Sequence, residues 1–290
     1  MMFDQVSGLR KLAAENKQIS KRSMRVIAVT SGKGGVGKTN FTVNLALALR
    51  QLGCRVLIMD GDLGMANVDV AFGLTPKYTL QHLFAGEKNI EEIVLWGPRG
   101  IGILPGGSGI QNLSNLEKND LENIVVNMGR LEKLTDILLI DTGAGISPTV
   151  INFLQAADDI ILITTPEPTS LTDAYGLLKV LYEDREQATV NVVVNRVRAE
   201  RDGQETFNRL SMAVRKFLNG SVRSLGWIYD DSNVFQAVMR QEPIGLSYPD
   251  TKAYRCIEWV AGNVMGIYRN PPHRAGGIRG FLGSLFRSQI

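Results

Sequence analysis

A glycine-rich loop with two lysines is the part of this 290-residue sequence whose residue types and spacing most clearly indicate chemistry. The loop has the spacing G-x-x-x-x-G-K-[ST], in which backbone N–H groups converge on a phosphate, the lysine supplies a positive charge and the hydroxyl meets Mg²⁺. A glycine turn before a helix, the simpler interpretation, explains neither Lys38 nor Thr39. The predicted nucleotide-binding residues of this loop are Gly32, Lys33, Gly34, Gly35, Val36, Gly37, Lys38, Thr39 and Asn40.

The elements on either side of this loop must hold it in position. An apolar, β-branched run at 26–29 precedes the loop, and an amphipathic stretch at 41–52 follows it. This order predicts a strand, a loop and then a helix. The N-terminus of such a helix carries about half a positive charge and has unpaired N–H donors, and both features favour phosphate.

Two further apolar runs end in carboxylates. Residues 56–59 lead into Asp60 and Asp62, and residues 137–140 lead into Asp141. Ligands of open parallel sheets bind beyond the carboxyl ends of the strands, so we expect these acids to face Mg²⁺ and water. An apolar run that ends in one acid is also the usual source of a carboxylate that holds Mg²⁺ in phosphoryl-transfer enzymes. A polar strand end for the first two acids, and a helix cap for Asp141, are the alternatives.

Strands and helices alternate along the rest of the sequence. Further strands are expected at 101–104, 160–164, 190–194 and 224–228, and further helices at 116–134, 169–182, 204–218 and 251–268. Such alternation indicates a parallel sheet that right-handed crossovers cover with helices on both faces. The predicted fold class is therefore α/β, with a single P-loop NTPase domain at 24–268 and a mostly parallel sheet.

Composition excludes several classes of protein. The sequence is 44% apolar and 21% charged, which is ordinary for a globular protein with a sizeable core. Cys54 and Cys256 form no C-x-x-C motif, which argues against zinc or iron–sulfur ligation and fits a reducing cytoplasm. We expect neither a secretory signal nor a membrane-spanning stretch. A net charge of +3 does not by itself call for nucleic acid.

The two ends of the chain differ from this domain. Residues 1–23 are predicted to form an arm that either stays loose or packs locally, or folds as a short helix on a partner. Residues 269–276 form a Pro/Gly linker, and residues 277–290 have the pattern of a basic amphipathic helix for an anionic membrane surface. Packing of this helix against its own domain is the alternative. The predicted membrane residues are Ile278, Phe281, Leu282, Leu285 and Phe286.

Taken together, these motifs resemble those of the MinD/ParA family of dimeric ATPases. The loop matches the family's K-G-G-x-G-K-[ST] pattern, residues 60–69 resemble its switch I segment D-x-D-x-G-x-x-N-x-D, and residues 141–145 resemble its switch II segment D-x-x-x-G. The resemblance covers about residues 24–268. It implies ATP and Mg²⁺ as cofactors and an ATP-dependent homodimer with ATPase activity.

The resemblance also implies roles for individual residues. Lys33 would reach the nucleotide of the partner subunit, and Asp62 would orient the attacking water. The catalytic residues implied in this way are Lys33, Lys38, Asp60 and Asp62, and the metal-binding residues are Thr39, Asp62 and Asp141.

Base recognition is implied for the end of the strand at 190–194. Asn195 and Arg196 are similar to a pair that holds adenine in MinD-type ATPases, and an amide suits the Watson–Crick edge of adenine. A simple turn at the strand end is the alternative. Asp231 is a further nucleotide-binding candidate, in a segment where the family often has a proline and this sequence has Tyr229.

Two segments resemble the branch of this family that regulates flagellar number. Residues 4–10 are similar to its D-Q-A-x-x-L-R arm, with Val6 for alanine, and residues 167–175 are similar to its E-P-T-S-[IL]-T-D-A-Y stretch. In that branch the arm activates the flagellar GTPase FlhF. The resemblance therefore implies that residues of the arm bind FlhF. An ATP-bound dimer would present two C-terminal amphipathic helices at once, so we expect a cytoplasmic monomer to alternate with an ATP-bound dimer on the inner face of the membrane. The partner-binding residues are Asp4, Gln5, Leu9 and Arg10.

Other functions remain open on the same fold. A cell-division-site regulator of the MinD type would share every motif described above. A ParA-type partitioning ATPase would bind DNA, which is not expected because no domain helix has a strong Lys/Arg stripe. An iron–sulfur carrier of the related Mrp type would need a C-x-x-C motif. A small-molecule kinase would use the same loop but transfer the phosphate to a substrate.

Overall fold

The computed structural model describes residues 24–62, 67–106, 127–184 and 188–267. The predicted arm at 1–23, the linker at 269–276 and the amphipathic helix at 277–290 lie outside these described residues. The same holds for the predicted partner-binding residues Asp4, Gln5, Leu9 and Arg10, and for the predicted membrane residues Ile278, Phe281, Leu282, Leu285 and Phe286.

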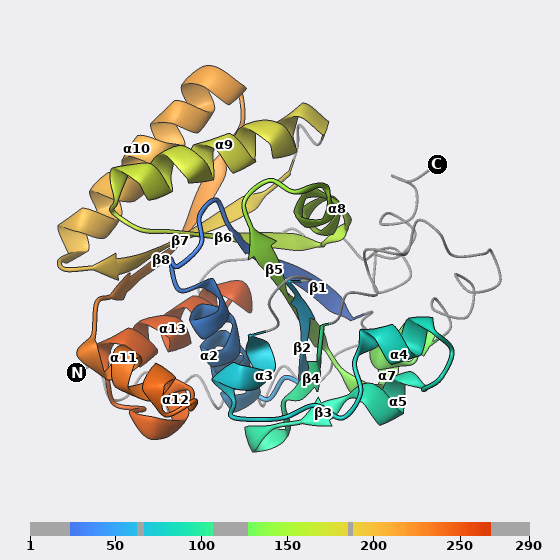
Figure 1. Ribbon diagram of the computed structural model, residues 1–290. Helices are drawn as coiled ribbons and strands as arrows, with labels where there is room; N and C mark the ends of the chain where they lie inside the picture. Colours follow the sequence, from blue (N-terminus) through green and yellow to red (C-terminus); the bar gives the residue numbers. More distant parts are fainter. Residues whose placement is uncertain (1–23, 63–66, 107–126, 185–187, 268–290) are drawn as a thin grey trace.

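A single sheet of eight strands forms the centre of the described chain (Figure 1). The strand order is β3-β4-β2-β5-β1-β6-β7-β8, and every neighbouring pair is parallel except β3 with β4. The strands are β1 (Arg25–Ser31), β2 (Val56–Gly61), β3 (Leu95–Trp96), β4 (Gly102–Leu104), β5 (Ile137–Ala144), β6 (Asp159–Thr164), β7 (Val190–Val197) and β8 (Val222–Tyr229). Because β1 lies between β5 and β6, the chain order reverses at β1, which is where sheets of this type bind ligands.

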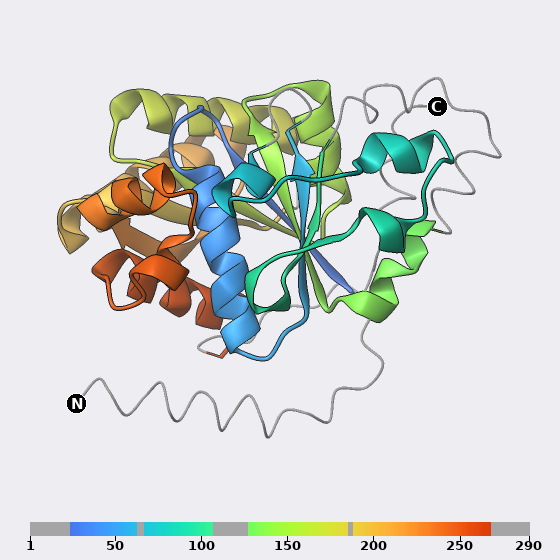
Figure 2. The same ribbon diagram turned by 60° about the horizontal axis from the view of Figure 1, so that its bottom comes forward.

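Helices cover both faces of the sheet (Figures 1 and 2). One face packs against α4 (Leu80–Phe84), α5 (Ile90–Ile93), α7 (Leu131–Leu134), α8 (Pro148–Ala156), α9 (Pro168–Asp184) and α10 (Glu200–Leu218). The other face packs against α2 (Lys38–Gln51), α3 (Val68–Ala71), α11 (Ser232–Met239), α12 (Ile244–Ser247) and α13 (Lys252–Val264). A 3₁₀ turn, η1 (Pro98–Gly100), leads into β4.

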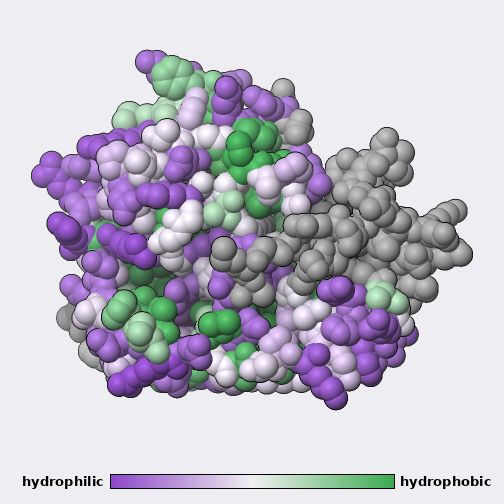
Figure 3. Space-filling model, viewed as in Figure 1, coloured by the Kyte–Doolittle hydropathy of each residue, from purple (hydrophilic) through white to green (hydrophobic). Residues whose placement is uncertain are grey.

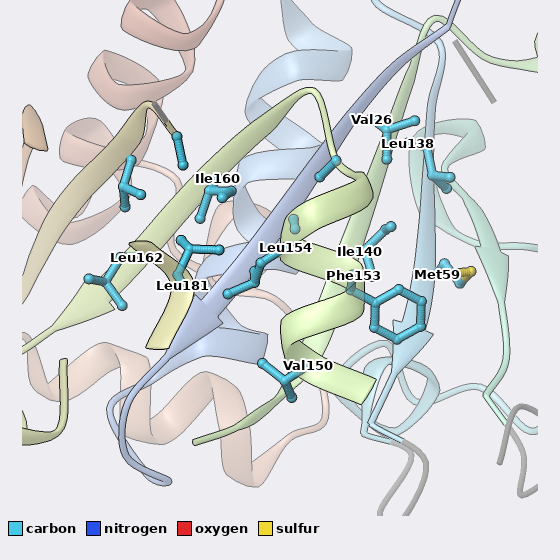
Figure 4. Packing of buried hydrophobic residues seen from close by; sticks show 14 of the residues in the cluster. Val26, Met59, Leu138, Ile140, Val150, Phe153, Leu154, Ile160, Leu162 and Leu181 are labelled. Carbon is cyan, nitrogen blue, oxygen red and sulfur yellow. The ribbon is translucent and has the colours of Figure 1, made fainter. Parts of the chain in front are cut away.

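The central strands are apolar at almost every position because both of their faces are buried. In β1, Val26 and Ala28 join the core under α8 and α9, whereas Ile27 and Val29 join the core under α2 and α13. Side chains of a strand alternate between its two faces, so a strand covered on both sides has a continuous apolar sequence. Figure 4 shows the first of these cores, where α8 lays Phe153 and other apolar side chains over the sheet.

The prediction of a single α/β domain with a mostly parallel sheet is confirmed. Each strand expected from the sequence is present, and the edge strand β3 was not predicted. The helix expected at 251–268 ends earlier, at Val264, because Gly266 adopts a left-handed φ of 70° that terminates it. Within the expected helix at 116–134, residues 116–126 lie outside the described chain, and the short helix α7 occupies 131–134.

The sequence analysis did not predict α8 and α11, nor the single-turn helices α3 and α12. Ser147 caps α8 and Pro148 occupies its first turn, while the Asp231 side chain caps α11, so the starts of α8 and α11 carry ordinary helix signals.

The eight-residue helix α11 exposes much of its apolar surface. Phe235, Val238 and Met239 are 65%, 44% and 68% exposed, and Figure 3 shows apolar atoms over this helix.

None of the described helices has the length and apolar character needed to cross a bilayer.

Candidate functional site

The glycine-rich loop joins β1 to α2 and needs glycine at particular positions. Gly35 and Gly37 have φ values of 77° and 93°, which residues with a side chain rarely adopt. A Cβ added to Gly37 would lie 2.5 Å from Asn195 Nδ2, and one added to Gly32 would overlap the backbone of Asp173 on α9. Glycine therefore lets the loop curl tightly over the end of the sheet.

The loop offers unoccupied space and N–H donors to an anion. Gly34 and Gly35 are exposed, and a Cβ added to either would meet nothing within 4 Å. Gly37 is the N-cap of α2 and has no side chain that could bond the first N–H groups of the helix. These donors and the helix dipole favour a negatively charged group at this position.

Three predicted residues meet at Asp141, which lies within β5 because this strand continues to Ala144. Asp141 pairs in the sheet with Val29 of β1 and with Asp60 of β2, so its carboxylate lies next to the loop. Lys38 Nζ lies 3.2 Å from Asp141 Oδ1, and Thr39 Oγ1 donates to Asp141 Oδ2 over 2.6 Å. The lysine and the hydroxyl of the loop, which are predicted to contact phosphate and metal, therefore both contact the Asp141 carboxylate of β5.

Asp60 is placed to hold its own loop in position. Its side chain is 1% exposed and accepts three backbone N–H bonds, from Asp62 at 3.0 Å, Asn67 at 2.8 Å and Val68 at 3.1 Å. Burial, together with the nearby charge of Asp141, raises the pKa of Asp60 to about 6, although the backbone bonds oppose the shift. Because both carboxylate oxygens accept backbone bonds, a direct catalytic role for Asp60 stays a prediction.

Asp62 lies at the edge of the same site. A Cβ built on Gly143 would stand 3.8 Å from Asp62 Oδ1, so this carboxylate faces the segment that follows Asp141. Gly61, which precedes Asp62, pairs in the sheet with Thr142, which follows Asp141. The predicted roles of Asp62, orienting water and binding metal, remain predictions.

Lys33, the second lysine of the loop, contacts residues of its own chain. Lys33 Nζ lies 3.1 Å from Glu167 Oε2 and 3.0 Å from Thr169 Oγ1, at the start of α9. Its side chain is 39% exposed. Ser31 Oγ donates to the carbonyl of Lys33 over 2.9 Å and fixes the backbone at this point.

The residues predicted to bind the base make structural hydrogen bonds. Asn195 Nδ2 donates to the carbonyl of Val36 over 2.8 Å, and Asn195 Oδ1 accepts the N–H of Arg196, whose φ is 58°. Asp231 Oδ1 accepts from Asn233 N and Nδ2, both at 3.0 Å, and so caps α11. The amide of Asn195 ties β7 to the loop, and adenine recognition by these residues stays a prediction.

Sequence reasoning missed three residues of the site. Thr42 donates to Asp141 Oδ1 over 2.9 Å, and Glu167 and Thr169 hold Lys33. One signal was available for Thr42, because it follows Lys38 by four residues and therefore lies on the same face of the helix. Glu167 and Thr169 belong to the segment singled out for its resemblance to the flagellar branch.

The residues present fit a magnesium nucleotide. A hydroxyl and carboxylates supply the oxygen ligands that Mg²⁺ prefers, and Mg²⁺ commonly binds through one or two carboxylates together with substrate phosphates. Thr39 and Asp141 are in direct contact, and Lys38 is 8% exposed beneath an open glycine loop. A phosphate on this loop would place its charge beside the Lys38 ammonium.

Comparisons with known proteins agree with this geometry. A family described as an AAA domain matches residues 24–193. The chain is 40% identical over 245 residues to the antiactivator FleN of Pseudomonas aeruginosa, covering 84% of this chain and 88% of FleN. It is 33% identical to the flagellum site-determining protein YlxH of Helicobacter pylori, covering 84% of this chain and 82% of YlxH. The structure of the septum site-determining protein MinD with Mg-ADP from Pyrococcus horikoshii superposes with a TM-score of 0.67 at 27% identity, covering 84% of this chain and 97% of that one.

Proposed function

The chain belongs to the MinD/ParA family of P-loop ATPases, and from this membership we propose that it hydrolyses ATP to ADP and phosphate as an ATP-dependent homodimer that regulates flagellar number or placement. The observation that carries the proposal is the convergence of Lys38 and Thr39 on Asp141 beneath an open glycine loop that bears a second lysine. The name of the relative YlxH, a flagellum site-determining protein, supports the flagellar role over a cell-division or DNA-partitioning role.

Each residue of the site has a task in this proposal. Lys38 would exchange its contact with Asp141 for the phosphates of ATP, and Thr39, Asp62 and Asp141 are the residues that would hold Mg²⁺. When bound, Mg²⁺ would neutralise part of the negative charge on the phosphates. Asp62 orients the attacking water, and Lys33 crosses to the nucleotide of the partner subunit, where it acts as an arginine finger does in other NTPases.

The test separates binding from hydrolysis. Asp62→Ala is expected to bind ATP and to dimerise on size-exclusion chromatography, and to lose hydrolysis by at least about 100-fold, because the water is no longer oriented. The control is Asp250→Ala. Asp250 is an exposed acid that precedes α13 and forms an ion pair with Arg255 of that helix. An Asp62→Ala protein with the wild-type rate would remove this role for Asp62. A wild-type protein that neither dimerises with ATP nor releases phosphate would remove the proposed function.

Product analysis in the same assay addresses the kinase alternative. A P-loop kinase would transfer the γ-phosphate to a small molecule, so its turnover would require that acceptor. The proposed ATPase releases inorganic phosphate stoichiometrically with ADP from purified components alone.

The flagellar role includes activation of the GTPase FlhF by the arm at 1–23, with Asp4, Gln5, Leu9 and Arg10 as the contacting residues. A segment that mixes charge with one apolar contact can fold on a partner. Deletion of residues 1–20 should abolish stimulation of the partner GTPase and leave ATP hydrolysis intact. Loss of ATP hydrolysis in this deletion would show that the arm belongs to the ATPase fold instead.

Membrane cycling by the segment at 277–290 completes the proposal. One amphipathic helix binds anionic lipid weakly, but a dimer presents two, so the second insertion becomes intramolecular and avidity rises. The protein would therefore be cytoplasmic as a monomer and peripheral on the inner face of the membrane when ATP is bound. Co-sedimentation with anionic liposomes should fall on Phe281→Glu, on truncation at Pro272, and on exchange of ATP for ADP. Equal sedimentation of the wild type, the Phe281→Glu variant and the truncated chain with ATP would contradict membrane binding by this segment.

A further inference from the structure

The carboxylate of Asp141 accepts hydrogen bonds from three side chains, and only two of these have a predicted contact with nucleotide or metal. It is 1% exposed, and in the described part of the chain three side chains donate to it: Lys38 and Thr42 to Oδ1, at 3.2 and 2.9 Å, and Thr39 to Oδ2, at 2.6 Å. Two of these donors have another task once a magnesium nucleotide binds. The Lys38 ammonium turns to phosphate and the Thr39 hydroxyl turns to the metal.

Thr42 is the donor that stays in place. It lies on α2 one helical turn beyond Lys38, is 0% exposed and is flanked along the helix by buried residues. Its hydroxyl lies 3.0 Å from the carbonyl of Lys38 and 2.9 Å from Asp141 Oδ1, and it has a single proton to donate. The charged acceptor forms the stronger bond, and the carbonyl already belongs to the helix ladder. The proton therefore goes to Asp141.

We propose that Thr42 is a positioning residue, which holds the Asp141 carboxylate in the orientation that binds Mg²⁺ after Lys38 and Thr39 have turned to the nucleotide. With Oδ1 fixed by Thr42, Oδ2 points to the position that the Thr39 hydroxyl now occupies. The inference rests on the proposed function of the site. Thr42 itself touches neither nucleotide nor metal.

Loss of the Thr42 hydroxyl has a specific consequence. Asp141 would keep Lys38 as its remaining donor at Oδ1, so the carboxylate would compete with phosphate for the ammonium and would rotate away from the metal. Residues that orient a metal ligand in this way typically change metal affinity by about 10- to 100-fold when they are replaced. The effect should therefore appear in the Mg²⁺ dependence of nucleotide binding.

The experiment compares substitutions that differ only in the hydroxyl. Thr42→Val keeps the shape of the side chain and removes the hydroxyl, whereas Thr42→Ser keeps the hydroxyl. Binding of a fluorescent ADP analogue to the full chain is titrated with Mg²⁺ and repeated in EDTA. We expect Thr42→Val to raise the Mg²⁺ concentration for half-maximal binding by about tenfold or more, and to change the affinity in EDTA by less than about threefold. Thr42→Ser should have the wild-type Mg²⁺ dependence.

A merely structural role gives a different result. Thr206→Val makes the same change at a buried threonine of α10, outside the site, and should leave the Mg²⁺ dependence unchanged. If Thr42→Val weakens binding equally with Mg²⁺ and in EDTA, or if Thr42→Ser behaves like Thr42→Val, the inference is overturned. Should Thr42→Val not fold, Thr42→Ala is measured against Thr42→Ser in the same way. Absence of Mg²⁺-dependent binding in the wild type would instead contradict the proposed function.

Discussion

The Lys33 ammonium lies 3.1 Å from the Glu167 carboxylate of its own chain. The Thr169 hydroxyl completes the contact at 3.0 Å, so the start of α9 holds the second lysine of the loop in cis. In the proposed dimer this lysine serves the nucleotide of the other subunit. The contact with Glu167 must therefore open, once in each subunit, before the dimer can close.

Glu167→Gln should therefore strengthen ATP-dependent dimerisation. Exposed ion pairs contribute about 0.2–1 kcal/mol each, and two of them open per dimer, so the dissociation constant of the dimer should fall by about two- to thirty-fold. Analytical ultracentrifugation with ATP and the hydrolysis-deficient Asp62→Ala background measures this constant. Salt screens an exposed pair, so the gain over wild type should shrink as ionic strength rises.

The control for this prediction is Glu205→Gln. Glu205 forms an exposed ion pair with Arg201 on α10, away from the loop, so its replacement should leave the dimer constant unchanged. Weaker dimerisation of Glu167→Gln would mean that Glu167 serves the dimer itself rather than the isolated subunit.

Gly37→Ala should abolish nucleotide binding while the protein stays folded. An alanine at a φ of 93° costs about 1–3 kcal/mol, and its Cβ would lie 2.5 Å from Asn195 Nδ2, so the loop must shift. Isothermal titration with ATP and thermal unfolding measure the two effects. Gly176→Ala on α9 is the control, because its added Cβ meets nothing within 4 Å and should stabilise the helix by about 0.5–1 kcal/mol. Wild-type affinity of Gly37→Ala would contradict the assignment of the loop.

Asp60 should make the stability of the nucleotide-free protein depend on pH. Burial raises the pKa of Asp60 from 3.8 to about 6, so between these values the folded state keeps a proton that the unfolded state has released. Its contribution to the free energy of unfolding is complete below about pH 3.8 and is lost as pH rises through about 6, a change on the order of 3 kcal/mol. Urea unfolding in EDTA should show a difference between wild type and Asp60→Asn that declines across this range. A constant difference would show that the carboxylate titrates normally.

The strands and the phosphate loop could be predicted because their signals are local. The run before Asp141 is apolar throughout because β5 is buried on both faces, and the loop motif lies within a few adjacent residues. Contacts between distant residues could not be predicted in this way. Thr42 and Asp141 are 99 residues apart in sequence, and Lys33 and Glu167 are 134 apart, so only the packing of α2 and α9 against the sheet brings each pair together.

Asn195 is a further residue whose position, but not its contact, could be predicted from the sequence. Its position at the end of β7 was predicted from the chain order, but its hydrogen bond to the carbonyl of Val36 depends on how closely the loop approaches that strand. An amide has two donor hydrogens and two acceptor lone pairs, so Asn195 can brace the loop and still contact a base. The geometry is compatible with both roles, and the preference for ATP over GTP distinguishes them.

Asn195→Ala should lower the affinity for ATP more than the affinity for GTP. Loss of the brace to Val36 removes about 0.5–1.5 kcal/mol from the binding of either nucleotide, whereas loss of an adenine contact removes a similar amount from ATP alone. The ratio of ATP to GTP affinity, measured by competition with a fluorescent analogue, should therefore fall by about two- to tenfold. Asn191→Ala, earlier on β7, removes only a hydrogen bond to the carbonyl of Ile160 and should leave this ratio unchanged. If Asn195→Ala weakens both nucleotides by the same factor, Asn195 serves only to brace the loop, and adenine must be recognised elsewhere.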